Sequence, residues 1–126
     1  MTSTSKSNPS ISILLVEDDE AILEIQASIL TAKYPDVMHY TAANGRLGLD
    51  LFKTHTPDIV ISDINMPEMC GVQMSNKIRA IKPDTKFIAL TGKDSDEILF
   101  EFDHIIAKPV VFEDLFAAIE KCLGRI

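Results

Sequence analysis

The sequence has few cysteines and no long apolar run, and each shortage narrows the class of protein. Cys70 and Cys122 match no metal-binding or redox spacing, so two reduced thiols are expected. No apolar run approaches the length of a membrane span, so no membrane association is predicted. Residues 1–10 lack the apolar core of a signal peptide and are expected to form a disordered leader. A cytoplasmic protein is the resulting expectation.

Basic residues are also scarce. The chain has 12 Lys and Arg against 19 Asp and Glu, which gives a net charge of −7. Such a field repels phosphate backbones, so we expect no direct binding to nucleic acid. A length of 126 residues suits one domain with one core, predicted over residues 11–124.

Short apolar runs alternate with helical periodicity along the whole chain. This alternation predicts an α/β fold, a parallel sheet with helices on both faces. Strands are expected at residues 11–16, 37–41, 59–62, 86–90 and 104–107, the second of them an edge strand. A short acidic helix is expected over residues 94–102. The other helices are expected to carry apolar stripes of Ile22, Ile25 and Ile29; of Leu47, Leu51 and Phe52; of Met74, Ile78 and Ile81; and of Phe112, Leu115, Phe116, Ile119 and Leu123.

Polar side chains follow four of the five predicted strands. Ligands of such sheets sit beyond the carboxyl ends of the strands, so these residues are expected to lie together. They are Glu17 and Asp18 after the first strand, Asp63 at the end of the third, Thr91 after the fourth and Lys108 after the fifth. Asp19 is expected to cap the first helix rather than to bind a metal.

This set of side chains suits phosphoryl chemistry. Two carboxylates about 4 Å apart repel by roughly 4 kcal/mol at an effective dielectric constant of 20, which a divalent cation would offset. Hard oxygen ligands beside a phosphate suit Mg²⁺. An aspartate can accept a phosphoryl group, Lys108 could neutralise its oxygens and Thr91 could bond one of them. Pro67 and Gly71 turn the backbone sharply after the third strand, so that a carbonyl near Asn65 can face the metal.

The motifs together resemble the receiver domain of two-component response regulators. The family pattern is an acidic pair, an aspartate followed by x-x-Met-Pro-x-Met-x-Gly, a Thr or Ser, and Lys-Pro, each at a strand end. The resemblance covers residues 10 to 123. The residues that match the family pattern are Glu17-Asp18, Asp63 with Met66, Pro67, Met69 and Gly71, then Thr91, then Lys108-Pro109.

The resemblance implies a flavodoxin-like fold with strand order 2-1-3-4-5. It implies that Asp63 accepts a phosphoryl group from a histidine kinase or a histidine phosphotransfer protein and switches conformation to signal. It also implies Mg²⁺ held by Asp18, Asp63 and the carbonyl of Asn65, with Glu17 acting through water. A cis peptide before Pro109 is implied as well.

In that family the residues two beyond the acceptor and two beyond the threonine flank the hydrolytic water. Here these are Asn65 and Lys93, which we expect to tune the lifetime of the phosphoaspartate. The domain would not be an enzyme in the ordinary sense, since it would catalyse only its own phosphorylation and dephosphorylation.

The chain departs from the family pattern at three places; the first is expected to have a local loop effect only, and the other two bear on signalling rather than on phosphorylation. Cys70 stands where Asp or Asn is usual before the glycine. Ile105 replaces an aromatic residue whose rotation commonly reports phosphorylation. The segment between Thr91 and Lys108 is about one helical turn short, which predicts a shortened fourth helix.

Two alternatives remain at this point. One is an aspartyl-phosphate phosphatase of the haloacid-dehalogenase type, although Asn65 stands where those enzymes carry an acidic residue. The other is a receiver-like interaction module that is not phosphorylated. The sequence identifies neither the kinase nor the output domain, and it does not decide between a stand-alone receiver and a piece of a larger regulator. It leaves the oligomeric state open, a weak homodimer included.

Overall fold

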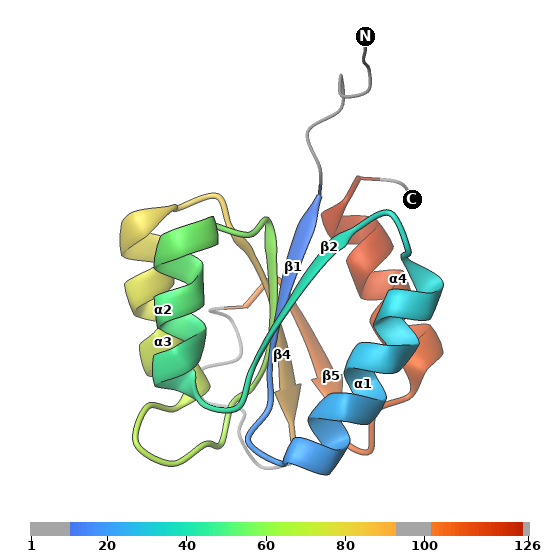
Figure 1. Ribbon diagram of the computed structural model, residues 1–126, viewed down its shortest axis with the longest axis horizontal. Helices are drawn as coiled ribbons and strands as arrows, with labels where there is room; N and C mark the ends of the chain where they lie inside the picture. Colours follow the sequence, from blue (N-terminus) through green and yellow to red (C-terminus); the bar gives the residue numbers. More distant parts are fainter. Residues whose placement is uncertain (1–10, 93–101, 125–126) are drawn as a thin grey trace, which may run out of the picture.

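A five-stranded parallel sheet forms the centre of the molecule (Figure 1). The computed structural model describes residues 11–92 and 102–124. Neighbouring strands follow the order β2-β1-β3-β4-β5, which confirms the predicted fold class. The strands are β1 (Ser12–Val16), β2 (Met38–Ala42), β3 (Ile59–Asp63), β4 (Lys86–Thr91) and β5 (His104–Ala107).

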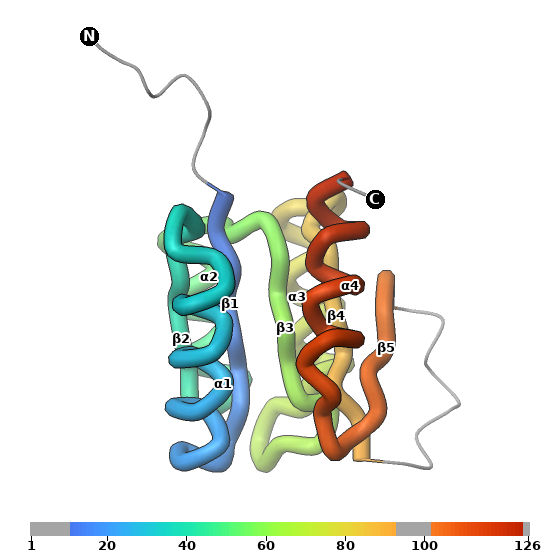
Figure 2. Tube along the Cα trace, turned by 90° about the vertical axis from the view of Figure 1, so that its right-hand side faces the viewer, coloured from blue at the N-terminus to red at the C-terminus, as the bar shows by residue number. Residues whose placement is uncertain are grey.

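Helices cover both faces of this sheet. Figures 1 and 2 show α1 and α4 on one face and α2 and α3 on the other. Because every strand runs in the same direction, all the carboxyl ends meet at one edge, opposite the start of β1 and the end of α4 (Figure 1). The described helices are α1 (Glu20–Lys33), α2 (Gly45–His55), α3 (Gly71–Ile81) and α4 (Phe112–Cys122).

The core consists of two apolar clusters separated by the sheet. Successive side chains of β1 alternate between them, with Leu14 in one cluster and Ile13 in the other. All five residues of β3 are buried, as a central strand covered on both faces requires. β2 is only partly buried, which confirms the expected edge strand.

The apolar stripe predicted for the first helix is wrong. Ile22 is 39% exposed and Ile25 is 57% exposed. The buried side of α1 instead carries Gln26 and Leu30. Both sets of residues recur at helical spacing, so periodicity does not decide which side meets the sheet. Because the buried Gln26 is polar, hydropathy does not identify its side of α1 as the one that faces the sheet.

Other predicted stripes hold in part. Met74 and Ile78 of α3 are fully buried, but Ile81, in the last turn, is 44% exposed. Leu47 of α2 is 46% exposed, whereas Phe52 is fully buried. The stripe predicted for the last helix is confirmed: its residues all belong to one cluster or pack against it.

Some expectations fall on residues that the structure does not describe. The leader, residues 1–10, is outside the described ranges, and so is nearly all of the helix expected over 94–102. Of that segment only Phe102 is described; it is 8% exposed and lies outside any helix. The centroid of its ring lies 5.2 Å from that of Phe87, with the two rings tilted by 38°. Among the described residues, no helix combines the length and the hydropathy needed to cross a membrane.

Candidate functional site

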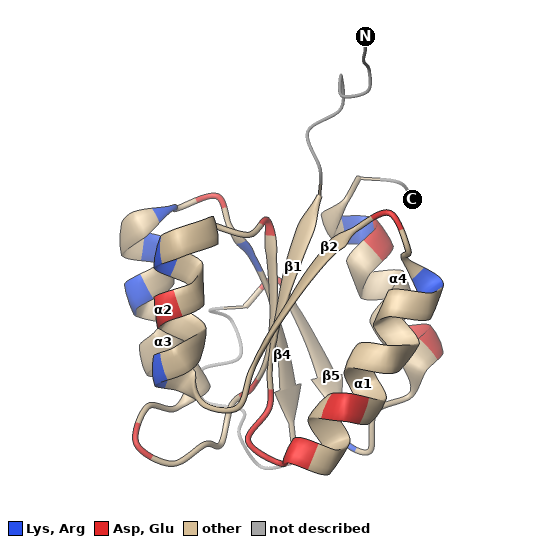
Figure 3. Ribbon diagram, in the orientation of Figure 1, with Lys and Arg blue, Asp and Glu red and all other residues tan. Residues whose placement is uncertain are grey.

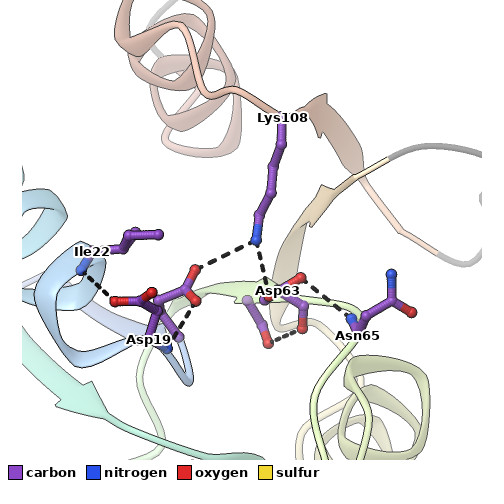
Figure 4. A network of polar contacts seen from close by, with 7 residues as sticks. Asp19, Ile22, Asp63, Asn65 and Lys108 are labelled. Atoms are coloured by element: carbon purple, nitrogen blue, oxygen red, sulfur yellow. Dashed lines mark hydrogen bonds and ion pairs between the residues drawn. The ribbon is translucent and has the colours of Figure 1, made fainter.

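The acidic loop after β1 begins the site. Glu17 is 1% exposed, and its Oε2 accepts a hydrogen bond from the backbone N–H of Asp19 at 3.1 Å. Asp19 Oδ1 accepts from the backbone N–H of Ile22 at 3.1 Å (Figure 4). Asp19 therefore caps α1, as predicted, which leaves Glu17 and Asp18 to face the sheet edge.

Asp63 ends the central strand in the middle of this edge. Its side chain is almost buried, and its Oδ1 accepts from the backbone N–H of Asn65 at 3.3 Å. The loop then folds back tightly, because Gly71 donates its N–H to the carbonyl of Ile64 at 2.8 Å. A Cβ on Gly71 would meet the carbonyl oxygen of Asp63 at 2.7 Å. Glycine is thus required by the close approach of the backbone beside Asp63.

Lys108 reaches across the edge to the two buried carboxylates. Its Nζ donates to Asp63 Oδ2 at 2.9 Å and lies 3.6 Å from Glu17 Oε1. Figure 4 shows Lys108 extending from the end of β5 toward Asp63. The Lys108–Pro109 peptide is cis, and the backbone N–H of Lys108 donates to the carbonyl of Thr91 at 2.7 Å. The ends of β1, β3, β4 and β5 are thereby joined.

Burial and charge shift the ionisation of this group in a consistent way. Burial raises the pKa of the Glu17 carboxyl, and the charge of Asp63 raises it further, against the N–H of Asp19 and the Lys108 ammonium. Burial alone would lower the pKa of Lys108. The hydrogen bond and the charge of Asp63, together with Glu17, outweigh that effect and leave the pKa of Lys108 raised. Lys108 is therefore a fully charged ammonium at neutral pH.

Thr91 ends β4 beside the acidic group. It is 6% exposed, and its Oγ1 has no hydrogen-bond partner among the described residues. Such a buried hydroxyl is free to donate to a new acceptor at this edge. Lys93, the other residue expected on this side, lies outside the described residues, so its expected role stays a prediction.

The carboxylates are arranged as a hard cation would require. Glu17, Asp18 and Asp63 each place one oxygen within 4.8 Å of the others. This all-oxygen donor set, with one exposed member and two buried ones, suits Mg²⁺, which keeps several of its waters. The residues present therefore fit the metal that the sequence predicted. Asp18 and Asp63 would hold it directly, and the Asn65 carbonyl is the remaining predicted ligand.

Sequence reasoning missed one polar residue and an apolar patch next to this site. Gln26 of α1 is 4% exposed, and its Oε1 has no hydrogen-bond partner in the described part of the chain. Together with Ile22 and Ile25 it lines a cavity of about 230 Å³ beside Lys108 and Pro109. Val111, 49% exposed, follows on the same loop. No motif marks these residues; only the orientation of α1 brings them here.

The fold and the site together define a class of protein. It is a doubly wound α/β domain in which a lysine-paired aspartate and an acidic metal-type cluster share the carboxyl edge of the sheet. The chain matches the family model of the response regulator receiver domain over residues 13–120. It belongs to this family and is a receiver domain of a two-component response regulator. Receiver domains accept phosphoryl groups from kinases as signalling proteins rather than as classical enzymes.

Named relatives and solved structures agree with this assignment. The chain is 32% identical over 114 residues to the probable C4-dicarboxylate response regulator DctR of Bacillus subtilis, covering 86% of this chain and 50% of DctR. It is 31% identical over 118 residues to the cell cycle response regulator CtrA of Brucella ovis, covering 90% of this chain and 50% of CtrA. The chain thus spans about half the length of these two regulators.

Two solved receivers share the fold closely. A response regulator receiver domain protein of Clostridium thermocellum superposes with a TM-score of 0.82 at 29% identity, over 91% of this chain and 95% of that one. The response regulator TrrA of Thermotoga maritima, solved in complex with Mg²⁺-BeF, gives a TM-score of 0.80 at 31% identity, over 89% and 98%. Neither the phosphatase nor the unphosphorylated module is favoured by these likenesses.

Proposed function

We propose that Asp63 is the phosphoacceptor of this receiver domain. The observation that carries the proposal is the pairing of its buried carboxylate with the Lys108 ammonium at 2.9 Å, at the carboxyl end of the central strand. Asp18 is exposed and caps no helix, whereas Asp63 is held by both Lys108 and the Asn65 N–H. A fixed orientation is what a nucleophilic carboxylate needs.

The transfer that we propose forms a bond between an Asp63 carboxylate oxygen and phosphorus. It breaks the P–N bond of a phosphohistidine, and the leaving imidazole retains the electron pair and takes up a proton. Lys108 and the Thr91 hydroxyl stabilise the charge on the phosphoryl oxygens. Mg²⁺, when bound by Asp18, Asp63 and the Asn65 carbonyl, would add positive charge at the same place. Glu17 would act on it through water.

The donor would be a histidine kinase or a histidine phosphotransfer protein. The exposed Ile22, Ile25 and Val111 lie around the Lys108–Pro109 loop and give the site an apolar border. Such a border favours a protein donor over a free metabolite, since burying it would contribute about 25 cal/mol per Å². A kinase takes its phosphoryl group from ATP, so the proposal places the domain in the cytoplasm. We expect no nucleic acid binding by this chain itself, given its charge of −7.

The switch that we propose works through Thr91. Its Oγ1 has no partner among the described residues, so turning toward a phosphoryl group would break no hydrogen bond. Ile105, which pairs with Ala89 across β4 and β5, is half-buried against the core. It would move only in response to the movement of Thr91. Asn65 and Lys93 would tune the lifetime of the phosphoaspartate.

A small phosphodonor tests the acceptor. With acetyl phosphate and Mg²⁺, the wild-type chain should become a phosphoprotein, and Asp63→Asn should abolish the label. Asp50→Asn, at an exposed position of α2, is the matched control and should label normally. A label that persists in Asp63→Asn would refute the assignment. Steady turnover of added phosphoesters would instead indicate a phosphatase, and neither labelling nor turnover would indicate a bare interaction module.

A further inference from the structure

A further cavity of the described structure lies away from Asp63, over the edge strand β2. It measures about 650 Å³ and is bounded by α1 on one side and α2 on the other. Figure 1 looks onto this edge, with β2 in front and the two helices to either side. The volume falls within the range of about 300–1,000 Å³ that ligand sites occupy. We call it the β2 groove, lined by Glu20, Leu23, Glu24, Ala27, Thr41, Ala42, Ala43, Leu47, Asp50, Leu51 and Thr54.

Much of the lining of the β2 groove is apolar. Leu23 of α1 and Leu51 of α2 are half-buried, and Leu47 is 46% exposed. An exposed leucine at a groove gains about 25 cal/mol per Å² when a partner covers it. β2 is the last strand of the sheet, so no further strand pairs with its outer edge in the described part of the chain. The outer backbone groups of β2 are therefore also open to a polypeptide.

The rim of the β2 groove carries charge of one sign. Glu20 and Glu24 of α1 and Asp50 of α2 all line it and are exposed. No lysine or arginine lines it within the described ranges. Figure 3 shows acidic residues on both α1 and α2, the helices to either side of β2. An acidic occupant would be repelled here, and a neutral one would have no charged partner. A cationic occupant could pair with three carboxylates.

We propose that the β2 groove docks a cationic amphipathic segment of a partner protein. Apolar side chains of the segment fill the floor at Leu23, Leu47 and Leu51, and its Lys or Arg residues pair with the rim carboxylates. The open edge of β2 distinguishes a peptide from a small molecule, because it offers backbone partners as well. This interaction is separate from phosphotransfer at Asp63, so either proposal can fail without the other.

A synthetic amphipathic peptide of Lys and Leu tests the proposal, read by fluorescence anisotropy and by backbone amide shifts of the whole chain. The largest shifts should fall at Leu23, Leu47 and Leu51. Glu24→Lys with Asp50→Lys should weaken binding by about tenfold, as expected for two lost ion pairs turned repulsive. The matched control is Asp36→Lys with Glu113→Lys, which alters net charge equally at exposed positions outside the groove. It should change affinity by less than about threefold.

Two further probes separate the apolar contribution from the charge. A Lys–Ser peptide of the same charge should bind more weakly than the Lys–Leu peptide, and Leu47→Ser should weaken only the latter. Equal weakening by the two double variants would mean that the peptide senses net charge alone, which overturns the proposal. Absence of binding, or amide shifts centred outside the groove, would overturn it as well.

Discussion

Lys108 offers the sharpest test of how the site is held together. Replacing it with Met leaves the nearly buried carboxylates of Asp63 and Glu17 without their cation. At 2.9 Å and an effective dielectric constant of about 20, the attraction between Lys108 and Asp63 is roughly 6 kcal/mol before desolvation is counted. Breaking a buried pair costs about 3–5 kcal/mol. Since the Lys108 side chain is 29% exposed, solvent screening lowers our expectation to about 2–3 kcal/mol.

Thermal unfolding followed by circular dichroism at pH 7, with EDTA present, measures this loss. At about 4 °C per kcal/mol for a domain of this size, Tm should fall by roughly 10 °C. The pKa of Lys108 in the folded protein is raised above its ordinary 10.5, so the stability that its charge contributes is complete at pH 7. This stability is lost only as the pH rises above 10.5 and through the raised pKa. Added Mg²⁺ should restore part of the loss, because it supplies the missing positive charge to the same carboxylates.

The matched control is Lys121→Met. Lys121 is exposed on α4 and makes no ion pair with any described residue. The Tm of the Lys121→Met variant should therefore differ from that of the wild type by less than about 2 °C. If Lys108→Met lowered Tm no more than Lys121→Met does, the two buried carboxylates would not depend on Lys108. A loss that Mg²⁺ left unchanged would contradict the placement of metal and ammonium at one site.

Three other outcomes follow from the same geometry. Asp18→Ala should weaken Mg²⁺ binding in a calorimetric titration, since one carboxylate of the cluster is lost; unchanged affinity would exclude Asp18 as a ligand. Because the pKa of Glu17 is raised, its charged form costs stability once pH exceeds the ordinary 4.5, so Glu17→Gln should raise Tm at pH 7 without Mg²⁺, a gain that vanishes at acid pH. Gly71→Ala should cost about 1–3 kcal/mol in urea unfolding because its Cβ meets the Asp63 carbonyl. Gly92→Ala should not, since its Cβ meets no atom of the described residues within 4 Å; equal effects would contradict the close approach.

The sequence predicted the sheet edge better than the helix faces. Glu17, Asp63, Thr91 and Lys108 could be placed together because parallel strands bring their ends to one edge whatever the packing of the helices. The inner face of α1 was predicted wrongly because Ile22 and Ile25 are more apolar than the buried Gln26. Only the direction in which α1 leaves the loop after Asp19 decides which side meets the sheet, and that direction is a tertiary property.

The same failure explains why the surfaces around the site escaped prediction. When isoleucines lie on the exposed side of a helix, periodicity alone predicts that this side is the buried one. The apolar border beside Pro109 and the β2 groove are both lined in part by side chains of α1. Hydropathy can suggest whether such a side chain is buried or exposed, but it does not say which residues lie next to it. Their neighbours, Phe112 on one flank and Leu47 on the other, come from distant parts of the chain.

A single physical requirement connects the core of this domain to its chemistry. A carboxylate such as Asp63 can be held nearly buried only if a cation lies within reach, and Lys108 can reach it only if β5 is held in the same sheet as β3. β4 lies between them and ends in Thr91, whose carbonyl accepts the Lys108 N–H while its hydroxyl has no partner among the described residues. The backbone of Thr91 thus fixes the cation, and its side chain stays available for a new bond. In the proposed switch, positioning and signalling would be divided between two groups of Thr91. A phosphoryl group on Asp63 could recruit the hydroxyl while the carbonyl still holds the backbone of Lys108 in place.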